Sequence, residues 1–171
     1  MKEYSKYVGK DFKIGDQDCY GLIRDFYLEE YGMTLTNYAR PDLFWHDDNL
    51  SLYENNIRAE GFKRIDFEDV RSLKTGDIIL AAIGSVNPCH ALIYLGQGKV
   101  LHHFVNRRSC IETYGGTWRN STMSAYRHPK VTELEPKMQT MEITEDDRIK
   151  AFIEARARRS GESRSSDQKR D

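Results

Sequence analysis

The stretch Asp18-Cys19-Tyr20-Gly21-Leu22-Ile23-Arg24-Asp25-Phe26-Tyr27-Leu28-Glu29-Glu30-Tyr31 places a cysteine at the start of a predicted helix. Apolar residues recur along it at the spacing of one helix face. Asp18 is a suitable N-cap residue, and Gly32 stands where a helix often ends. We therefore predict a helix that begins at or just before Cys19, with a thiol in its first turn.

Beyond this helix, apolar runs of strand length alternate with turn residues. The predicted strands cover residues 78–83, 90–95, 99–105 and 109–114, and the segment 96–98 turns the chain between the middle two. Residues 33–75 are less regular: we expect one or two short helices within 43–61 and a short strand within 62–70. A helix followed by an antiparallel meander is an α+β domain.

The end of the chain has a different character from the rest. We predict a first domain over residues 1–130, an extension with a helix over 131–159, and a disordered polar tail over 160–171. The tail has no aromatic residue, so it lacks the means to build a core.

Composition excludes some classes of protein. The 171 residues carry 26 basic and 27 acidic side chains, so the basic surface typical of nucleic-acid binding is not expected. No apolar run approaches the ~18 residues that a membrane span needs, and no secretory signal is visible at the N-terminus. We therefore expect synthesis in a cytosol, and because three cysteines do not form a closed set of disulfides, we expect at least one free thiol there.

The position of Cys19 suggests a nucleophile. Unpaired N–H groups and the positive end of the helix dipole favour the thiolate, and the same N–H groups can hold an oxyanion. The alternative is a buried core cysteine, because free cysteines are often buried.

A thiol nucleophile needs a base, and that base needs an orienting partner. His90 begins a predicted strand directly after a loop, which suits the base. His102 and His103 lie on the next strand. If residues 96–98 form the turn, residue 92 opposes 102 and His102 shares a face with His90. If only residues 97–98 form it, His103 takes that face, and the spacing alone leaves both possibilities open.

Four short segments in this order resemble the NlpC-type cell-wall peptidases. They are Asp18-Cys19-Tyr20-Gly21-Leu22, Gly76-Asp77-Ile78-Ile79, His90-Ala91-Leu92-Ile93-Tyr94-Leu95-Gly96 and Val100-Leu101-His102. The similarity covers residues 4 to 128. Within the family, Tyr7-Val8-Gly9 and Arg24-Asp25-Phe26-Tyr27 resemble the tail-assembly proteins of lambda-like phages.

The resemblance implies a papain-like fold and hydrolysis of amide bonds in peptidoglycan stem peptides, usually between D-γ-glutamate and a diamino acid. It implies Cys19 as nucleophile, His90 as base and His102 as the orienting residue. It also implies that Tyr7 lies near the site, and we expect Asp18 and Tyr20 to support the substrate or the oxyanion.

The resemblance further implies partners and a location. The expected partners are a peptidoglycan peptide and other phage tail proteins, with no metal, cofactor, nucleic acid or membrane insertion. The protein is expected to be made in the bacterial cytoplasm and carried in the virion tail.

Three alternatives compete with this interpretation. A zinc site could use Cys89, His90, His102, His103 and Cys110, although no pair has the short spacing of structural zinc ligands. A tail component could keep the fold and lack activity, because fold does not fix function. A related amidase or acyltransferase could use the same catalytic pair on another substrate.

Overall fold

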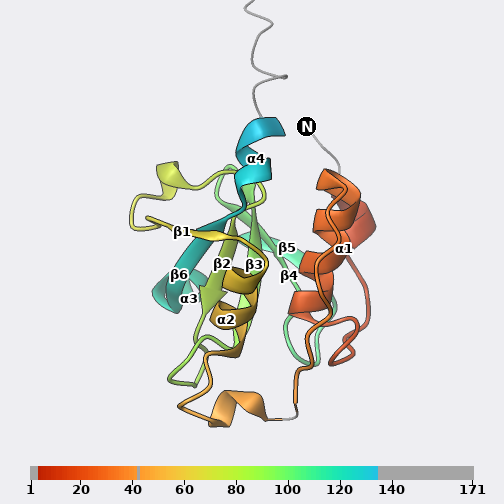
Figure 1. The fold of residues 1–171 in the computed structure, drawn as a ribbon, viewed down its shortest axis with the longest axis vertical. Helices are drawn as coiled ribbons and strands as arrows, with labels where there is room; N and C mark the ends of the chain where they lie inside the picture. Colours follow the sequence, from red (N-terminus) through yellow and green to blue (C-terminus); the bar gives the residue numbers. More distant parts are fainter. Residues whose placement is uncertain (1–3, 42, 135–171) are drawn as a thin grey trace, which may run out of the picture. The chain divides into compact units, whose positions relative to one another are not determined.

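The computed structural model describes residues 4–41 and 43–134, and Figure 1 shows how their elements are arranged. The helices are α1 (Cys19–Tyr31), α2 (Leu52–Ala59), α3 (Gly116–Asn120) and α4 (Pro129–Leu134), with 3-10 helices at Ser5–Tyr7, Phe44–His46 and Val70–Ser72. The strands are β1 (Lys63–Ile65), β2 (Ile78–Ala81), β3 (His90–Gly96), β4 (Lys99–His102), β5 (Cys110–Thr113) and β6 (Thr122–Arg127). They form one six-stranded sheet in the order β1-β6-β2-β3-β4-β5.

Helix α1 has the ends that the sequence predicts. The Asp18 carboxylate accepts a hydrogen bond from the backbone N–H of Gly21 at 2.8 Å, which satisfies one of the free donors of the first turn. At the other end, Gly32 adopts the left-handed conformation with φ 63°, and its N–H donates to the carbonyl of Leu28. The caps fix Cys19 as the first residue of the helix.

Helix α1 packs against one face of the sheet. Its buried Ile23 and Phe26 belong to the same core as Ala91 and Ile93 of β3. The alternate β3 residue Leu92 belongs to a second core on the other face, as expected for side chains that alternate along a strand. The predicted α+β class, with the cysteine-bearing helix on an antiparallel sheet, is confirmed.

The meander is only part of the sheet. Strands β2, β3, β4 and β5 follow one another as predicted, but β6 and β1 extend the sheet beyond β2. Strand β6 and helix α3 were not predicted, because β6 mixes buried and exposed residues without regular alternation. The predicted strand over residues 99–105 ends earlier, at His102.

The β3–β4 hairpin decides which histidine accompanies His90. Gln97 and Gly98, with φ 52° and φ 67°, form a two-residue turn of the kind that needs positive φ. A bulge between Tyr94 and Gly96 then shifts the register, so that Leu92 pairs with His102. The pairing expected for a three-residue turn is therefore reached by a shorter turn plus a bulge.

Two further expectations concern the remaining parts of the chain. Among residues 4–41 and 43–134, no helix is long and apolar enough to cross a membrane. The predicted helix within the extension and the polar tail lie outside the described residues.

Candidate active site

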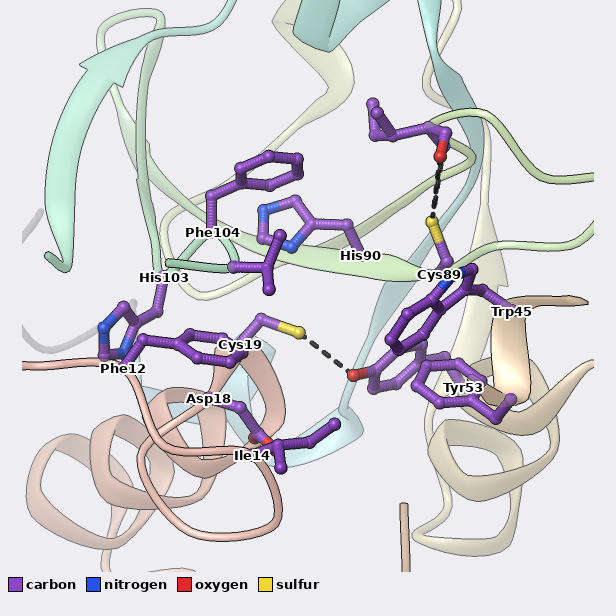
Figure 2. Close-up of a pocket in the computed structure, with 13 residues that line it drawn as sticks. Phe12, Ile14, Asp18, Cys19, Trp45, Tyr53, Cys89, His90, His103 and Phe104 are labelled. Carbon is purple, nitrogen blue, oxygen red and sulfur yellow. Dashed lines mark hydrogen bonds between the residues drawn. The ribbon is translucent and has the colours of Figure 1, made fainter. Parts of the chain in front are cut away.

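A pocket of about 190 Å³ lies where the head of α1 meets the start of β3. Cys19 and His90 both line it, and Figure 2 shows them approaching the pocket from two elements that are far apart in sequence. Much of the remaining wall is aromatic and includes Phe12, Trp45 and Tyr53. The structure thus brings the predicted nucleophile and the predicted base into one cavity.

Cys19 is almost completely enclosed. Its side chain is part of a residue only 5% exposed, and its Sγ lies 3.1 Å from the Tyr53 hydroxyl. Burial and then the charge of Asp18 raise the pKa of the Cys19 thiol to about 12, although hydrogen bonds from Tyr53 and the backbone of Ala91 oppose the rise. The helix N-terminus was expected to favour the thiolate, but at this enclosed site burial raises the pKa of the thiol instead.

His90 and His102 form a hydrogen-bonded pair. His90 Nε2 lies 3.2 Å from His102 Nδ1, and their rings meet edge to face. Burial, followed by the neighbouring His102 and His103, lowers the pKa of His90 to about 3, so the imidazole is neutral at rest. The Nε2 atom is used toward His102, and Nδ1 has no hydrogen-bond partner among the described residues. That nitrogen is the one available to accept a proton.

Glu112 extends this pair and was not foreseen from the sequence. Its Oε2 lies 3.7 Å from His102 Nε2. Burial lowers the pKa of His102, while the Glu112 carboxylate acts in the opposite direction. Cys110 on β5 pairs with His102 on β4, and Glu112 lies two residues after Cys110. Only the register of these strands reveals the contact.

His103 directly follows His102, the last residue of β4. It also lines the pocket, but its ring packs edge to face against Phe12 at 5.3 Å between centroids. Its Nε2 is buried and has no hydrogen-bond partner among the described residues. His102, and not His103, is therefore the partner of His90.

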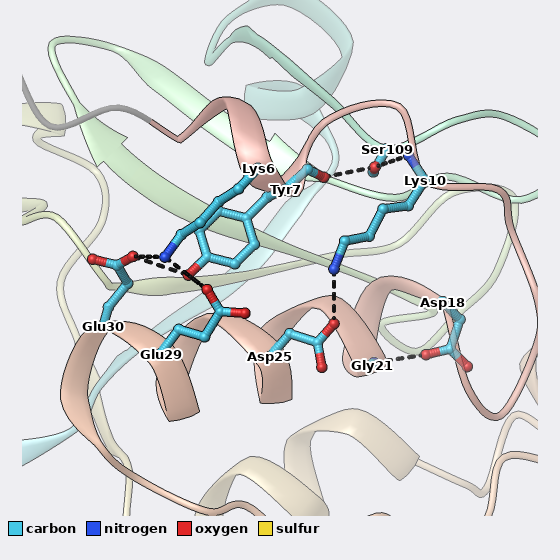
Figure 3. Close-up of polar contacts among 9 residues, drawn as sticks. All are labelled: Lys6, Tyr7, Lys10, Asp18, Gly21, Asp25, Glu29, Glu30 and Ser109. Atoms are coloured by element: carbon cyan, nitrogen blue, oxygen red, sulfur yellow. Dashed lines mark hydrogen bonds and ion pairs between the residues drawn. The ribbon is translucent and has the colours of Figure 1, made fainter.

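Tyr7 does not reach the pocket, which corrects the expectation from the resemblance. Its hydroxyl donates to Glu30 at 2.9 Å and to Glu29 at 3.2 Å, near the far end of α1 (Figure 3). Its backbone carbonyl accepts a hydrogen bond from Ser109 Oγ at 2.7 Å. Tyr7 fastens the N-terminal segment to α1 and to the segment before β5.

A hydroxyl beside Cys19 is supplied instead by Tyr53 of α2. Burial raises the pKa of Tyr53 well above its usual value, so the hydroxyl stays protonated and can donate to sulfur. Tyr53 follows Cys19 by 34 positions, and no sequence signal marks it.

Asp18 and Tyr20 have mainly structural contacts. The Asp18 carboxylate lines the pocket but also pairs with Arg40 Nε at 2.5 Å and accepts the backbone N–H of Gly15 at 2.6 Å. Tyr20 is fully buried and packs on Tyr53 with ring centroids 6.2 Å apart. Asp18 therefore caps the helix that carries Cys19, and the Tyr20 ring packs against the Tyr53 ring.

Comparison with known proteins finds phage relatives. The chain is 35% identical over 121 residues to the tail tip assembly protein K of Escherichia phage lambda, with 71% of this chain and 58% of the relative covered. It is 27% identical over 124 residues to the protein of the same name from Escherichia phage N15, with 71% and 49% covered. The chain thus spans about half the length of the curated relatives it matches.

Solved structures also show similarity. The NlpC/p60 domain of peptidoglycan hydrolase SagA matches with a TM-score of 0.48 and 18% identity over 72% of this chain and 91% of that one. An NLP/P60 family protein from Staphylococcus aureus subsp. aureus Mu50 matches with a TM-score of 0.49 and 20% identity over 71% and 37%.

The family assignment rests on the match to the family as a whole. The NlpC/P60 family model matches residues 4–127, which include Cys19, His90 and His102. This range agrees with the extent of the resemblance found in the sequence. The chain belongs to the NlpC/P60 family.

Proposed function

We propose that this chain is a cysteine endopeptidase that hydrolyses amide bonds in peptidoglycan stem peptides. The observation that carries the proposal is that Cys19 and His90 line one pocket while His102 is hydrogen-bonded to His90. A thiol, a base and a group that orients the base are the parts that acyl transfer requires. Membership of the NlpC/P60 family supports the same chemistry.

The proposed reaction starts from neutral partners. The Cys19 thiol transfers its proton to Nδ1 of His90 as sulfur attacks the substrate carbonyl. His102 orients the His90 ring because its Nδ1 accepts a hydrogen bond from the Nε2–H of His90. The backbone N–H groups at the head of α1 stabilise the oxyanion. His90 then gives its proton to the leaving amine, and water hydrolyses the thioester to release the peptide acid and the thiol.

The relatives suggest where the protein acts. Because two of them are named tail tip assembly proteins, we propose that the chain works with other phage tail proteins and is carried in the virion tail. The finer substrate assignment, the bond between D-γ-glutamate and a diamino acid, rests on the family resemblance.

Digestion of purified peptidoglycan tests the proposal. We expect soluble fragments whose masses correspond to cleavage within the stem peptide, with a new amino terminus at the diamino acid. His102→Gln should reduce the rate by about 10²–10⁴-fold, because His90 loses its orienting partner. Release of sugar fragments alone, or no release at all, would contradict the proposal.

His103→Gln is the matched control for this digestion, because His103 directly follows His102 in the chain but packs against Phe12 instead of His90. It should leave the fragment pattern of the wild type in place. A larger loss for His103→Gln than for His102→Gln would reassign the orienting role.

The enclosed thiol favours a second candidate, a tail component that keeps the fold without activity. With a pKa of about 12, Cys19 is protonated at neutral pH. A protein without activity can keep this proton on the thiol, whereas a peptidase must remove it when substrate binds. Peptidoglycan digestion distinguishes these cases, and the reactivity of Cys19 toward an alkylating reagent tests the protonated resting thiol that both of them share.

We expect iodoacetamide to modify Cys19 very slowly at pH 7. A thiol is protonated below its pKa, so at pH 7 the thiolate fraction is ~10⁻⁵ for a pKa of about 12, compared with a few per cent for an ordinary thiol. The rate should rise about tenfold per pH unit, as followed by mass spectrometry of the peptide that contains Cys19. Rapid labelling that persists into acid would instead reveal a thiolate–imidazolium pair at rest.

A further inference from the structure

We propose that His102, Cys110 and Glu112 form a binding site for a divalent transition-metal ion of the zinc type. The site lies beside the hydrogen-bonded pair of His90 and His102, and His102 belongs to both. It lies outside the pocket that contains Cys19.

The pairing of β4 with β5 places the three ligands together. His102 lies directly opposite Cys110 in this antiparallel pair. Glu112 follows Cys110 by two residues on the same strand, so its side chain points to the same face. No short sequence spacing marks the site, because its ligands come from two strands.

The distances between ligand atoms suit one ion. His102 Nε2 lies 3.5 Å from Cys110 Sγ, and the two oxygens of Glu112 lie 3.6 Å from Cys110 Sγ (Oε1) and 3.7 Å from His102 Nε2 (Oε2). When each residue supplies one ligand atom, the three atoms all lie within 4.8 Å of one another. Tetrahedral zinc with bonds of ~2.3 Å to sulfur and ~2.0–2.2 Å to nitrogen and oxygen requires separations of about 3.4–3.6 Å. One ion can therefore contact all three groups once the side chains, that of Glu112 above all, move closer together.

The chemistry of the ligands selects the class of metal. A thiolate, an imidazole and a carboxylate are zinc ligands, whereas magnesium and calcium prefer oxygen. The thiolate and the carboxylate together neutralise a divalent charge. Cys110 and Glu112 are only half-buried, which leaves a fourth position open to water.

Surrounding side chains hold Glu112 in place. Trp118 Nε1 donates to Glu112 Oε2 at 2.6 Å, which orients the carboxylate as an outer-shell partner does in metal sites. Arg107 Nη2 lies 3.6 Å from Glu112 Oε1 and competes with a cation, but its side chain is 60% exposed and can swing into solvent.

Metal binding has a consequence for the proposed catalytic pair, and this step rests on the proposed function. An ion on Nε2 of His102 leaves that ring's hydrogen on Nδ1, where it points at Nε2 of His90. His90 must then accept this hydrogen bond and carry its own hydrogen on Nδ1. In that tautomer His90 cannot take the proton of Cys19, so the bound metal acts as an inhibitor.

Cobalt(II) titration of the untagged Cys19→Ala chain tests binding independently of activity. We expect one equivalent to produce a near-ultraviolet thiolate-to-cobalt absorption band, which zinc then abolishes by displacement. The band should disappear in Cys19→Ala/Cys110→Ala, and Cys19→Ala/Glu112→Gln should bind more weakly. Absence of the band, or its persistence without Cys110, would overturn the proposed site.

A second measurement reads the coupling to His90. Imidazole ¹⁵N shifts of the same Cys19→Ala chain should show His102 with its hydrogen on Nδ1 once zinc is added. In peptidoglycan digestion, zinc should slow the wild type and spare Cys110→Ala, each relative to its own metal-free rate. Equal inhibition of the wild type and Cys110→Ala would place the inhibitory zinc on Cys19 and refute the coupling between the metal and His90. If neither protein digests peptidoglycan, the proposed function fails, while the cobalt titration still tests the metal site.

Discussion

Replacement of Cys19 by alanine is expected to abolish peptidoglycan digestion, with a loss of at least about 10⁴-fold in rate. The loss is expected because no other thiol among the described residues can replace Cys19 as the nucleophile. Cys89 also lines the pocket, but its Sγ is hydrogen-bonded to the backbone of Ile83. The substitution also removes only one sulfur atom from a residue that is buried beside Tyr53. The measurement is the appearance of soluble fragments, identified by mass.

Cys89→Ala is the matched control, since it removes the same group from the wall of the same pocket. It should retain the digestion pattern, and both variants should keep melting temperatures near that of the wild type. Equal digestion by Cys19→Ala and the wild type would remove Cys19 from the mechanism. A loss shared by both variants would point to damage to the pocket instead.

Replacement of Arg40 by methionine is expected to destabilise the domain by roughly 3–5 kcal/mol. Arg40 pairs with Asp18 while the two side chains are 0% and 3% exposed, so the substitution leaves a buried carboxylate without its cation. The free energy of unfolding in denaturant should fall by this amount, and the melting temperature by roughly 10 °C or more. Because Asp18 caps α1, the head of that helix should be the region most affected.

Arg108→Ala provides the comparison for an exposed pair. Arg108 contacts Asp11 at 3.1 Å, but the two side chains are 73% and 84% exposed, and such pairs contribute about 0–1 kcal/mol. The double substitution Asp18→Asn/Arg40→Met should recover part of the stability lost by Arg40→Met, because no charge then remains buried. A small effect of Arg40→Met alone would show that water reaches Asp18.

Local signals explain what could be predicted from the sequence. Helix α1 was predicted correctly because its periodic face and both of its caps lie within one short segment. The pairing of His90 with His102 needed the bulge near Gly96, which no propensity indicated. The family resemblance selected His102, and the register supplies the physical reason.

Contacts between distant segments explain what was missed. Tyr53 and Glu112 approach the site from α2 and β5, and their positions depend on packing and register rather than on neighbours in sequence. Tyr7 was placed wrongly because its distance from Cys19 along the chain does not reveal which end of α1 it contacts. The direction of the Cys19 pKa shift likewise depended on burial, which becomes visible only when the core is complete.

The contact between Tyr7 and Ser109 constrains the order of folding during synthesis. These two residues are 102 positions apart, and Lys10 also binds Ser109 through its backbone N–H. A ribosome must therefore make most of the domain before the N-terminal segment can dock, and closing so long a loop slows that step. Since Phe12 follows this segment and forms a pocket wall, the contacts that hold this side of the cavity around Cys19 in place can form only after Ser109 has been synthesised.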